Sequence, residues 1–503
     1  MSQIRRQSII SSVMVYIGFA LGFLNTYLFT REGGFSKEEY GLVGIFIAIA
    51  SLLYAAANLG MPSYIYKFFP YYQGRLHHRE NDLFTWAALV TLAGYLLITL
   101  AGIYFRDLII LKFGKHSPLL VEYFYWIFPL GFGLTAFSLL EAYAWQLGRP
   151  VFTNFLREVL FRLLSTILIL LTLTQIISSY DLFIKLYSFT YLILAFCLLF
   201  FLWSRREVAF TTRVSRVTRR FRKKILTLAS FVYGGSLIYA LSLIFDSLVI
   251  ASVMPDGLAD VAVFTLGQYM ANLIQAPQRG IIASSMGPLS LAWKEKNMER
   301  IRKIYQRSSI NQLIFSAGMF GLIWLNFTDG IHTFDLQQGY LDARWVFFWV
   351  GLYRIIDMGT GVSSQIISTS TLWRFEFYTG VVLLVLTLPL TYVMTKYTGL
   401  GILGPPIASF LSFTVYNGIR YFFLLRKFNL QPFSYKTLHT ILLTLFAYSL
   451  CHFLTGEREG LFWIFIRSLL YLIVFMYGVV QLKLTDDLQP VLQTIRKRLG
   501  GKT

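Results

Sequence analysis

The most constraining feature of this 503-residue chain is a series of fourteen long apolar segments. Most are about as long as the roughly 20 apolar residues that an α-helix needs to cross the ~30 Å hydrocarbon core of a bilayer. Hydrophobic residues make up 56% of the chain and charged residues only 14%, against about 45–50% and 25% in soluble proteins. The apolar runs are continuous, unlike the ~10-residue alternating segments of membrane β-barrels. The sequence therefore predicts an all-α integral membrane protein.

Short polar connections separate these segments. The first segment follows Arg5 and Arg6, is longer than the core of a signal peptide and has no small-residue cleavage site after it, so we expect a retained helix. The longest segments are expected to tilt or to extend beyond the bilayer. The predicted spans cover residues 8–29, 40–61, 82–105, 119–147, 158–178, 182–203, 226–252, 261–292, 308–328, 343–370, 375–395, 403–425, 436–455 and 461–482.

The chain is strongly basic, with a net charge of +20 from 45 Lys and Arg against 25 Asp and Glu. Cytoplasmic connections of membrane proteins carry an excess of Lys and Arg. With the N-terminus inside, thirty-one of the 45 basic residues fall in inside segments and nine in outside segments. This bias predicts a multi-pass protein with both termini in the cytoplasm and an even number of spans.

The most basic connection, residues 204–225, divides the chain. It has nine basic residues and one acid, Glu207, and is expected to contact anionic lipid headgroups. It leaves no room for a nucleic-acid recognition fold, so no nucleic-acid partner is expected. Six spans precede it and six follow it, which is typical of transporters with duplicated halves. The expected division is an N-lobe at 1–203, a basic cytoplasmic linker at 204–225, a C-lobe at 226–425, and the last two spans with the tail at 426–503.

Motifs for enzymatic or metal chemistry are scarce. The six histidines form no H-E-x-x-H pair, and no metal site is expected. Cys197 and Cys451 lie in apolar runs and are interpreted as small buried hydrophobic residues. The Gly131-Phe132-Gly133 segment resembles part of a dinucleotide fingerprint, but close helix packing explains it better because no strand precedes it. We expect no enzyme, no catalytic residue and no bound cofactor.

Four ionisable residues lie deep in the predicted spans, namely Asp246, Arg279, Arg354 and Asp357. A charge at the centre of a membrane helix costs at least about 2.5–3.5 kcal/mol, so such a residue usually faces a cavity or a partner. Arg354 and Asp357 are three residues apart and can pair on one helix face. This pair either neutralises itself and fixes helix packing, or it lines a transport cavity.

The two other deep charges also have alternatives. Arg279 lies between Pro277 and Gly280, where a helix is expected to bend and to free backbone groups for a ligand. Its planar guanidinium can hold an oxyanion with two hydrogen bonds, so it is the best candidate for anion binding. Asp246 either pairs with one of the deep arginines or binds a coupling cation.

Amides form a second polar feature inside the spans. The amides expected at a substrate site are Gln268, Asn272, Gln275, Asn25 and Asn58. The first three follow, with Arg279, the spacing of one helical face. Such a face should contact protein or water, where it bonds either to other helices or to sugar hydroxyls.

Other charged residues lie near the ends of spans and are expected to be structural. A long basic side chain in such a position can extend to the membrane surface, which is the expectation for Arg162 and Arg420. The others in this group are Arg467, Glu122, Glu141 and Glu158.

Four stretches resemble a known family. Residues 35–42 (Phe-Ser-Lys-Glu-Glu-Tyr-Gly-Leu) and 58–62 (Asn-Leu-Gly-Met-Pro) resemble the start of the polysaccharide exporters, the Wzx-type O-antigen and oligosaccharide flippases. Residues 246–251 (Asp-Ser-Leu-Val-Ile-Ala) resemble the end of the family's seventh span, and 293–307 resembles the charged loop after its eighth. In span count and loop placement the resemblance covers the whole chain.

The sequence also departs from this family and its relatives. Ala251 replaces a usual glycine, and Val263-Phe264 replaces a usual Leu-Tyr. The related lipid II flippases use arginines in the first two spans, where this chain has Asn25 and Asn58. The multidrug exporters of the same superfamily have twelve spans, whereas this chain has an additional pair within 436–482.

The resemblance implies about 14 transmembrane helices, with two six-helix lobes in a V around a central cavity and a C-terminal helix pair. It implies that the chain flips a polyprenyl-diphosphate-linked oligosaccharide by alternating access across the inner membrane of a bacterium, for O-antigen, lipopolysaccharide or capsule synthesis. A polysaccharide polymerase and glycosyltransferases are the protein partners that it suggests. Coupling to H⁺ or Na⁺, or the membrane potential, could supply the energy.

Two other classes of function stay open. An ion-coupled multidrug exporter of the same superfamily would need an acidic cavity, whereas the deep charges here are two arginines and two aspartates. A membrane-embedded glycan polymerase or glycosyltransferase would need a large extramembrane loop with catalytic side chains, and the longest outside loop expected here has about 15 residues.

Overall fold

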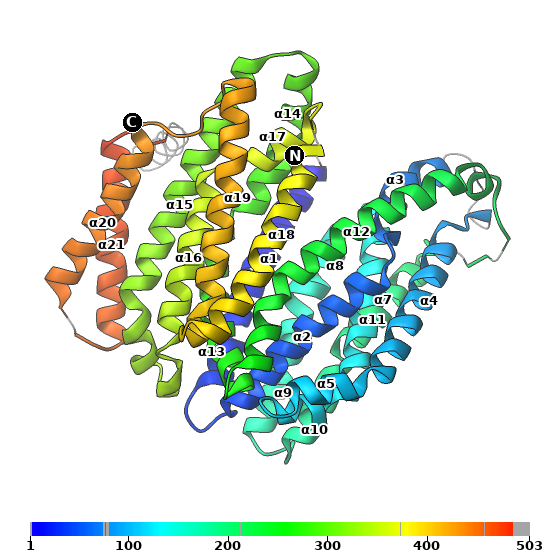
Figure 1. The fold of residues 1–503 in the computed structure, drawn as a ribbon, viewed down its shortest axis with the longest axis horizontal. Coiled ribbons are helices and arrows are strands. Elements are labelled where there is room, and N and C mark those ends of the chain that lie inside the picture. Colours follow the sequence, from blue (N-terminus) through cyan, green and yellow to red (C-terminus); the bar gives the residue numbers. More distant parts are fainter. Residues whose placement is uncertain are drawn as a thin grey trace, which may run out of the picture. The chain divides into compact units, whose positions relative to one another are not determined.

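A computed structural model describes residues 3–485 except 74, 75, 77–79, 209, 212, 373 and 457; the side chains of 3–13, 231, 232, 235, 236, 239, 243, 279 and 283 are also outside the description. The described part is helical throughout and contains no β-strand (Figure 1). Nine of its helices are long and apolar enough to cross a membrane. The predicted all-α membrane class is confirmed.

The chain forms two compact units, Met1–Ala262 and Val263–Thr503. This boundary lies inside the predicted C-lobe, and the predicted division into lobes stays a prediction. The helices of the first unit are α1 (Gln3–Thr30), α2 (Lys37–Ala57), α3 (Met61–Gln73), α4 (Leu83–Tyr104), α5 (Arg106–Phe113), α6 (Pro118–Glu122), η2 (Phe124–Trp126), α7 (Ile127–Gln146), α8 (Pro150–Asn154), η3 (Phe155–Leu160), α9 (Phe161–Leu173), α10 (Tyr180–Ser188), α11 (Thr190–Ser204) and α12 (Arg216–Val253).

The helix α13 (Gly257–Asn272) begins in the first unit and ends in the second. The helices of the second unit are then η4 (Leu273–Gln275), α14 (Gln278–Lys294), α15 (Met298–Thr333), η5 (Gln338–Tyr340), α16 (Ala343–Gly359), α17 (Ser363–Thr369), α18 (Arg374–Tyr397), η6 (Gly401–Leu403), α19 (Gly404–Phe428), α20 (Tyr435–Thr455) and α21 (Leu461–Gln481). Each of the fourteen predicted spans overlaps one or more of these helices.

The basic connection differs most from its prediction. We expected a linker over 204–225, but its second half is the first part of α12, which begins at Arg216. The hydroxyl of Ser215 caps the helix by accepting a hydrogen bond from the amide of Thr218. Val217 is buried while its basic neighbours are exposed, so this segment has the two faces of an amphipathic helix.

In the first unit, α7 is the central helix. It packs against α2, α3, α4 and α11, and most of its residues are buried. A Cβ added to Gly133 would lie 2.4 Å from the amide nitrogen of Leu192 in α11. The glycine therefore allows two helix backbones to approach closely, which confirms the packing interpretation of the Gly131-Phe132-Gly133 segment.

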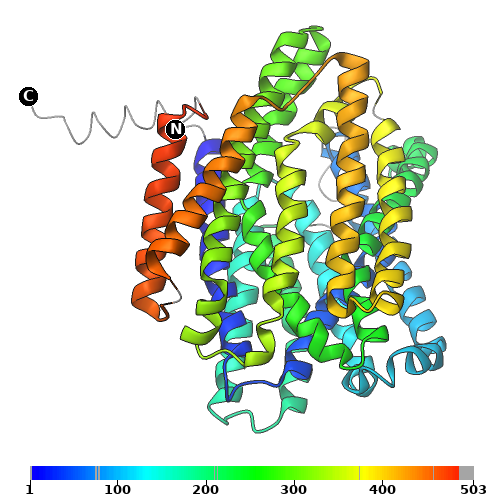
Figure 2. The same cartoon turned by 60° about the vertical axis from the view of Figure 1, so that its left-hand side comes forward.

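In the second unit, α15 packs against α14, α16, α20 and α21. The last helix pair, α20 and α21, lies against α15 (Figure 2). Arg467 of α21 forms an ion pair of 3.4 Å with Asp329 of α15, and both side chains are buried. A second bond from Arg467 reaches the carbonyl of Leu325. Arg467 is thus structural, as expected, and attaches the C-terminal pair to the rest of the unit.

Candidate functional site

The helix break in the second unit positions the deepest polar residues. The regular helix of α13 ends at Asn272, a 3-10 turn covers residues 273–275, and α14 begins at Gln278. Pro277 precedes that first residue, as the sequence predicted, whereas Gly280 lies within α14. The polar face predicted from Gln268 to Arg279 is therefore interrupted before Arg279, because proline cannot continue the helical hydrogen-bond pattern.

The carboxylate of Asp357, on α16, is the centre of a polar cluster. It accepts hydrogen bonds from the amide of Gln278 at 3.1 Å and from the amide of Asn417, on α19, at 3.3 Å. The hydroxyl of Thr360 donates to the carbonyl of Asp357 and to the side-chain oxygen of Asn417. We call Gln278, Asp357, Thr360 and Asn417 the Asp357 cluster. It brings residues from three helices to one point in the second unit.

Arg354 lies one turn before Asp357 but contacts a different residue. Its guanidinium donates to the side-chain oxygen of Asn272 at 3.3 Å and lies 4.8 Å from the ring centre of Tyr353. Among the described residues no carboxylate lies within ion-pair distance of it, so the predicted pair with Asp357 is not formed there. Its Nε is buried without a hydrogen-bond partner in the same part of the chain. The guanidinium of Arg354 can therefore donate hydrogen bonds to an anionic group.

A second charged group lies on α18 and α19. Arg420 is buried, contacts the carboxylate of Glu376, and lies 3.8 Å from the ring centre of Tyr416. The same carboxylate accepts a hydrogen bond from Ser364 at 2.7 Å. The expectation that Arg420 extends to the membrane surface is wrong, because its partner lies on a neighbouring helix and holds the side chain inside the unit.

The structure places the other predicted residues of the second unit near the break. Gln268 and Gln275 are half-buried and Asn272 is exposed. The backbone of Arg279 lies in the first turn of α14, next to Gln278, but its side chain is outside the described residues. Together with Arg354 and Asp357, these residues come from α13, η4, α14 and α16.

The predicted residues of the first unit have structural partners. Asn25 donates to the carbonyl of Arg162 at 2.9 Å and accepts from Thr166 at 2.6 Å, so it joins α1 to α9. Asn58 caps α2 and accepts a bond from the amide of Gly60. Asp246 is buried in α12. Both asparagines thus bond to backbone groups of the helices around them.

The first unit has a buried ion pair that includes Glu141, which we expected to be structural because it lies near the end of a span. Glu141 is buried in α7 and forms an ion pair of 3.0 Å with Arg157. Arg157 lies in η3, a π-helical segment at Phe155–Leu160 that interrupts α8 and α9. Single π-helical turns often occur at functional sites. In the sequence, Glu141 lies in one predicted span and Arg157 directly precedes the next, but only the fold shows that they meet.

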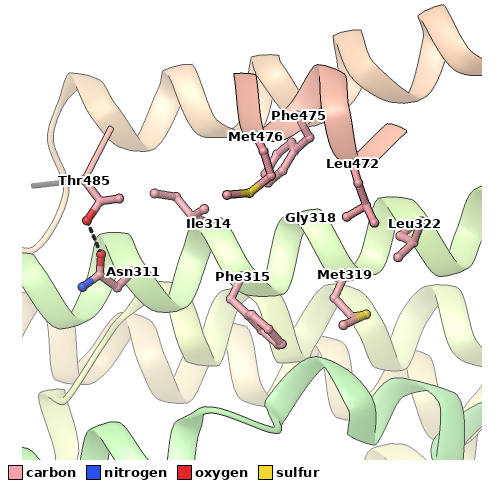
Figure 3. Close-up of a pocket in the computed structure, with 10 residues that line it drawn as sticks. All are labelled: Asn311, Ile314, Phe315, Gly318, Met319, Leu322, Leu472, Phe475, Met476 and Thr485. Atoms are coloured by element: carbon pink, nitrogen blue, oxygen red, sulfur yellow. Dashed lines mark hydrogen bonds between the residues drawn. The ribbon is translucent and has the colours of Figure 1, made fainter. Parts of the chain in front are cut away.

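An apolar groove lies between α15 and α21 in the second unit (Figure 3). It has a volume of about 420 Å³ and is lined mainly by aliphatic, aromatic and methionine side chains. Gly318 lines it on the α15 side, where an added Cβ would lie 2.7 Å from the ring of Phe475, and Thr485 and Asn311 bond to each other at one end. Its shape and apolar lining suit a hydrocarbon chain better than a polar solute.

These features give the second unit the elements of an amphiphile site. Arg354 offers a positive charge, the amides near the helix break offer hydrogen bonds, and the groove offers apolar surface. Aromatic rings on α16 and α19 also stack, with Tyr353 and Phe413 4.8 Å apart. Rings of this kind are suited to the faces of sugars and to cations.

No protein-family model matches the sequence, and no curated protein matches it significantly. Solved structures do match. One described as the lipid II flippase MurJ in an inward-closed conformation has a TM-score of 0.71 at 14% identity, over 93% of this chain and 98% of that one.

An inward-facing multidrug resistance MATE family transporter of the MOP superfamily has a TM-score of 0.62 at 15% identity, over 83% of this chain and 94% of that one. A MATE structure in complex with MaL6 has a TM-score of 0.58 at 15% identity, over 84% and 96%. This chain therefore has the membrane-transporter fold that the lipid II flippase and the MATE transporters share.

Proposed function

We propose that this protein is a flippase that moves a polyprenyl-diphosphate-linked oligosaccharide across the bacterial cytoplasmic membrane by alternating access, for cell-surface polysaccharide synthesis. The observation that carries the proposal is the likeness to a lipid flippase along 93% of the chain, at a higher TM-score than the MATE structures. The MATE structures cover 83–84% of it. The match to the lipid flippase covers more of the chain, which favours a lipid-linked cargo over a small drug.

The polar residues support a diphosphate-linked headgroup. Arg354 has a buried Nε without a partner among the described residues and a neutral partner, Asn272, at its tip. A phosphate oxygen would supply the missing acceptor, and its charge would offset the guanidinium. Arg279, which follows Gln278 in the sequence, stays the second candidate for anion binding.

The groove between α15 and α21 supports a lipid tail. A polyprenyl chain exposes many apolar methylene and methyl groups, each CH₂ gaining about 0.8 kcal/mol when it leaves water. The groove is formed by α21 of the C-terminal pair, which we expected to distinguish the chain from twelve-span exporters. It would hold part of the tail during reorientation of the headgroup.

The experiment uses the purified full-length protein in proteoliposomes with a fluorescent polyprenyl-diphosphate oligosaccharide. Quenching by a membrane-impermeant reductant reports how much label is in the outer leaflet. We expect faster exchange between leaflets than in protein-free liposomes. Equal rates would contradict the proposal, and so would transport of a lipophilic cation such as ethidium without transport of the glycolipid.

A lipid II flippase is the second candidate, since the fold match is to one. Lipid II and an oligosaccharide lipid share the diphosphate and the tail and differ in the sugar and peptide. Parallel assays with both substrates decide between them. We expect faster transport of the oligosaccharide lipid than of lipid II. The lipid II flippases use arginines in the first two spans, where this chain has Asn25 and Asn58.

A further inference from the structure

The N-terminal end of α12 has one continuous basic face. Helical positions three and four residues apart lie on the same side, and the basic residues follow this spacing. All five are exposed, whereas Val217 is buried and Phe221 and Ile225 are partly buried on the adjoining side, where Arg220 and Lys224 each lie 5.9 Å from the ring centre of Phe221. We call Arg216, Arg219, Arg220, Lys223 and Lys224 the basic face of α12.

This face is not neutralised by acids of its own segment. The only acid between residues 204 and 225 is Glu207, and its carboxylate bonds to Arg149 at 2.6 Å. Among the described residues none of these five side chains forms an ion pair, so five cations along about two and a half turns of one helix present a positive surface. Such a surface attracts a surface of negative charge within about a Debye length, roughly 8 Å at physiological salt.

The packing beneath this face is fixed by a chain of buried hydrogen bonds. Asp82, fully buried, accepts from the amide of Ser215 and the hydroxyl of Thr218, both at 2.8 Å. The hydroxyl of Tyr72 bonds to Thr218, and Tyr64 bonds to Tyr72, each at 2.7 Å. Burial raises the pKa of both tyrosines, so their hydroxyls stay protonated at neutral pH. The helix end is thus held in place before any ligand arrives.

Aromatic side chains beside this face mark the level of the membrane surface. Phe221 contacts Phe68 and Tyr71 of α3, with ring centres 5.6 and 5.2 Å apart. Tyr71 is 42% exposed. Tyrosine and tryptophan gather where hydrocarbon meets headgroups. The first exposed apolar side chain after these cations is Leu226, which is 67% exposed, as expected near the boundary between headgroups and hydrocarbon.

We propose that the basic face of α12 is a binding surface for the headgroups of anionic phospholipids in the adjacent leaflet. The occupant is a lipid rather than a soluble anion because the aromatic residues and Leu226 place the cations at the boundary of the bilayer. The sequence predicted contact of residues 204–225 with anionic lipids, and the helix adds that five of the charges are preorganised, so they lose little freedom on binding. This surface does not depend on the proposed cargo.

The test measures lipid binding to the full-length protein in detergent by native mass spectrometry. Phosphatidylglycerol and phosphatidylcholine with the same acyl chains are titrated separately. Each basic residue near an anionic surface strengthens attachment by about fivefold. We expect wild type to prefer phosphatidylglycerol, and the variant Arg219→Gln/Arg220→Gln/Lys223→Gln to bind it about 10- to 100-fold more weakly, with phosphatidylcholine unchanged.

A matched variant controls for the loss of three charges. Lys294, Arg302 and Lys303 are exposed basic residues of the second unit, and Lys294→Gln/Arg302→Gln/Lys303→Gln should keep the preference for phosphatidylglycerol. The charge-conserving variant Arg219→Lys/Arg220→Lys/Lys223→Arg should also keep the preference for phosphatidylglycerol. Attraction to a charged surface depends on the charge of a side chain more than on its shape. Both glutamine variants should unfold at the wild-type temperature, since they change exposed positions.

Three results would overturn the proposal. The first is undiminished phosphatidylglycerol binding by the α12 glutamine variant. The second is an equal loss in the control variant, which would mean a response to total charge. The third is displacement of phosphatidylglycerol by inorganic phosphate at equal concentration, which would identify a soluble-anion site. All three are read from binding, so failure of the flippase assay would leave this result unaffected.

Discussion

At the scale of single residues, Arg354 is the position where a substitution separates binding from structure. Its Nε is buried without a partner, and its tip contacts a neutral amide, among the described residues. We expect Arg354→Ala to lower the initial flipping rate in proteoliposomes by about 10- to 100-fold, because a hydrogen bond to a charged group is worth about 1.5–3 kcal/mol. Arg354→Lys should be intermediate, since lysine keeps the charge but loses the planar fork.

Arg344 is the matched control on the same helix. It lies near the start of α16, with its guanidinium 4.3 Å from the ring centre of Trp324. Arg344→Ala removes the same side chain ten residues away, about 15 Å along the helix, and should keep most of the transport rate. Equal losses in the two alanine variants would contradict a binding role for Arg354.

Asp357 should act mainly on stability. Asp357→Ala leaves the amide groups of Gln278 and Asn417 without their acceptor, and an unsatisfied buried donor costs about 1–3 kcal/mol. We expect a lower unfolding midpoint in detergent, followed by tryptophan fluorescence. Asp342 is exposed at the start of the same helix and makes no capping bond there, so Asp342→Ala should leave the midpoint within about 0.5 kcal/mol of wild type.

The sequence could identify deep charges but not their partners. Depth in an apolar run depends only on chain position, so Arg354 and Asp357 were predictable as residues that need a partner. Their partners depend on which side of each helix faces its neighbours. Asn417 lies 60 residues from Asp357, and Glu376 lies 44 from Arg420, and no local spacing brings these pairs together.

At the scale of helices, a close approach of α7 and α11 in the first unit depends on one glycine. A Cβ at Gly133 would lie 2.4 Å from the backbone of Leu192, and a backbone atom cannot yield as the end of a side chain can. We expect Gly133→Ala to destabilise the protein by about 1–3 kcal/mol, as overpacking does. Gly287 of α14 has no atom within 4 Å of its added Cβ, so Gly287→Ala should be neutral or stabilising in the same thermal unfolding assay.

Helix positions were predictable because apolar length alone marks a membrane span, and all fourteen predicted spans overlap helices. The break before α14 was predictable too, since Pro277 cannot donate a backbone hydrogen bond. The beginning of α12 was not. Its basic residues resembled a solvated linker, and the helix there depends on Ser215, Thr218 and a buried aspartate, Asp82, that is 133 residues away from the cap.

At the scale of the whole molecule, a lipid-linked cargo needs a polar site and an apolar path in the same protein. The second unit provides Arg354 with the amides around the helix break, and it provides the groove between α15 and α21 (Figure 3). Composition predicted the membrane class, because 56% hydrophobic residues exceed what a soluble core can bury. It could not predict the groove, which depends on how the side chains of α15 and α21 pack against each other.

Filling this groove should therefore affect long-tailed substrates alone. Met476 lines it from α21, and Met476→Trp adds a large ring where the tail would lie. If two or three methylene groups lose their contact at about 0.8 kcal/mol each, the KM for a long polyprenyl substrate should rise by about tenfold or more. A substrate with a short prenyl chain should be transported as by wild type. Ile473 lies on the same helix, is 57% exposed and does not line the groove, so Ile473→Trp should change neither value. An equal effect of Met476→Trp on long and short tails would assign the groove to helix packing instead of tail binding.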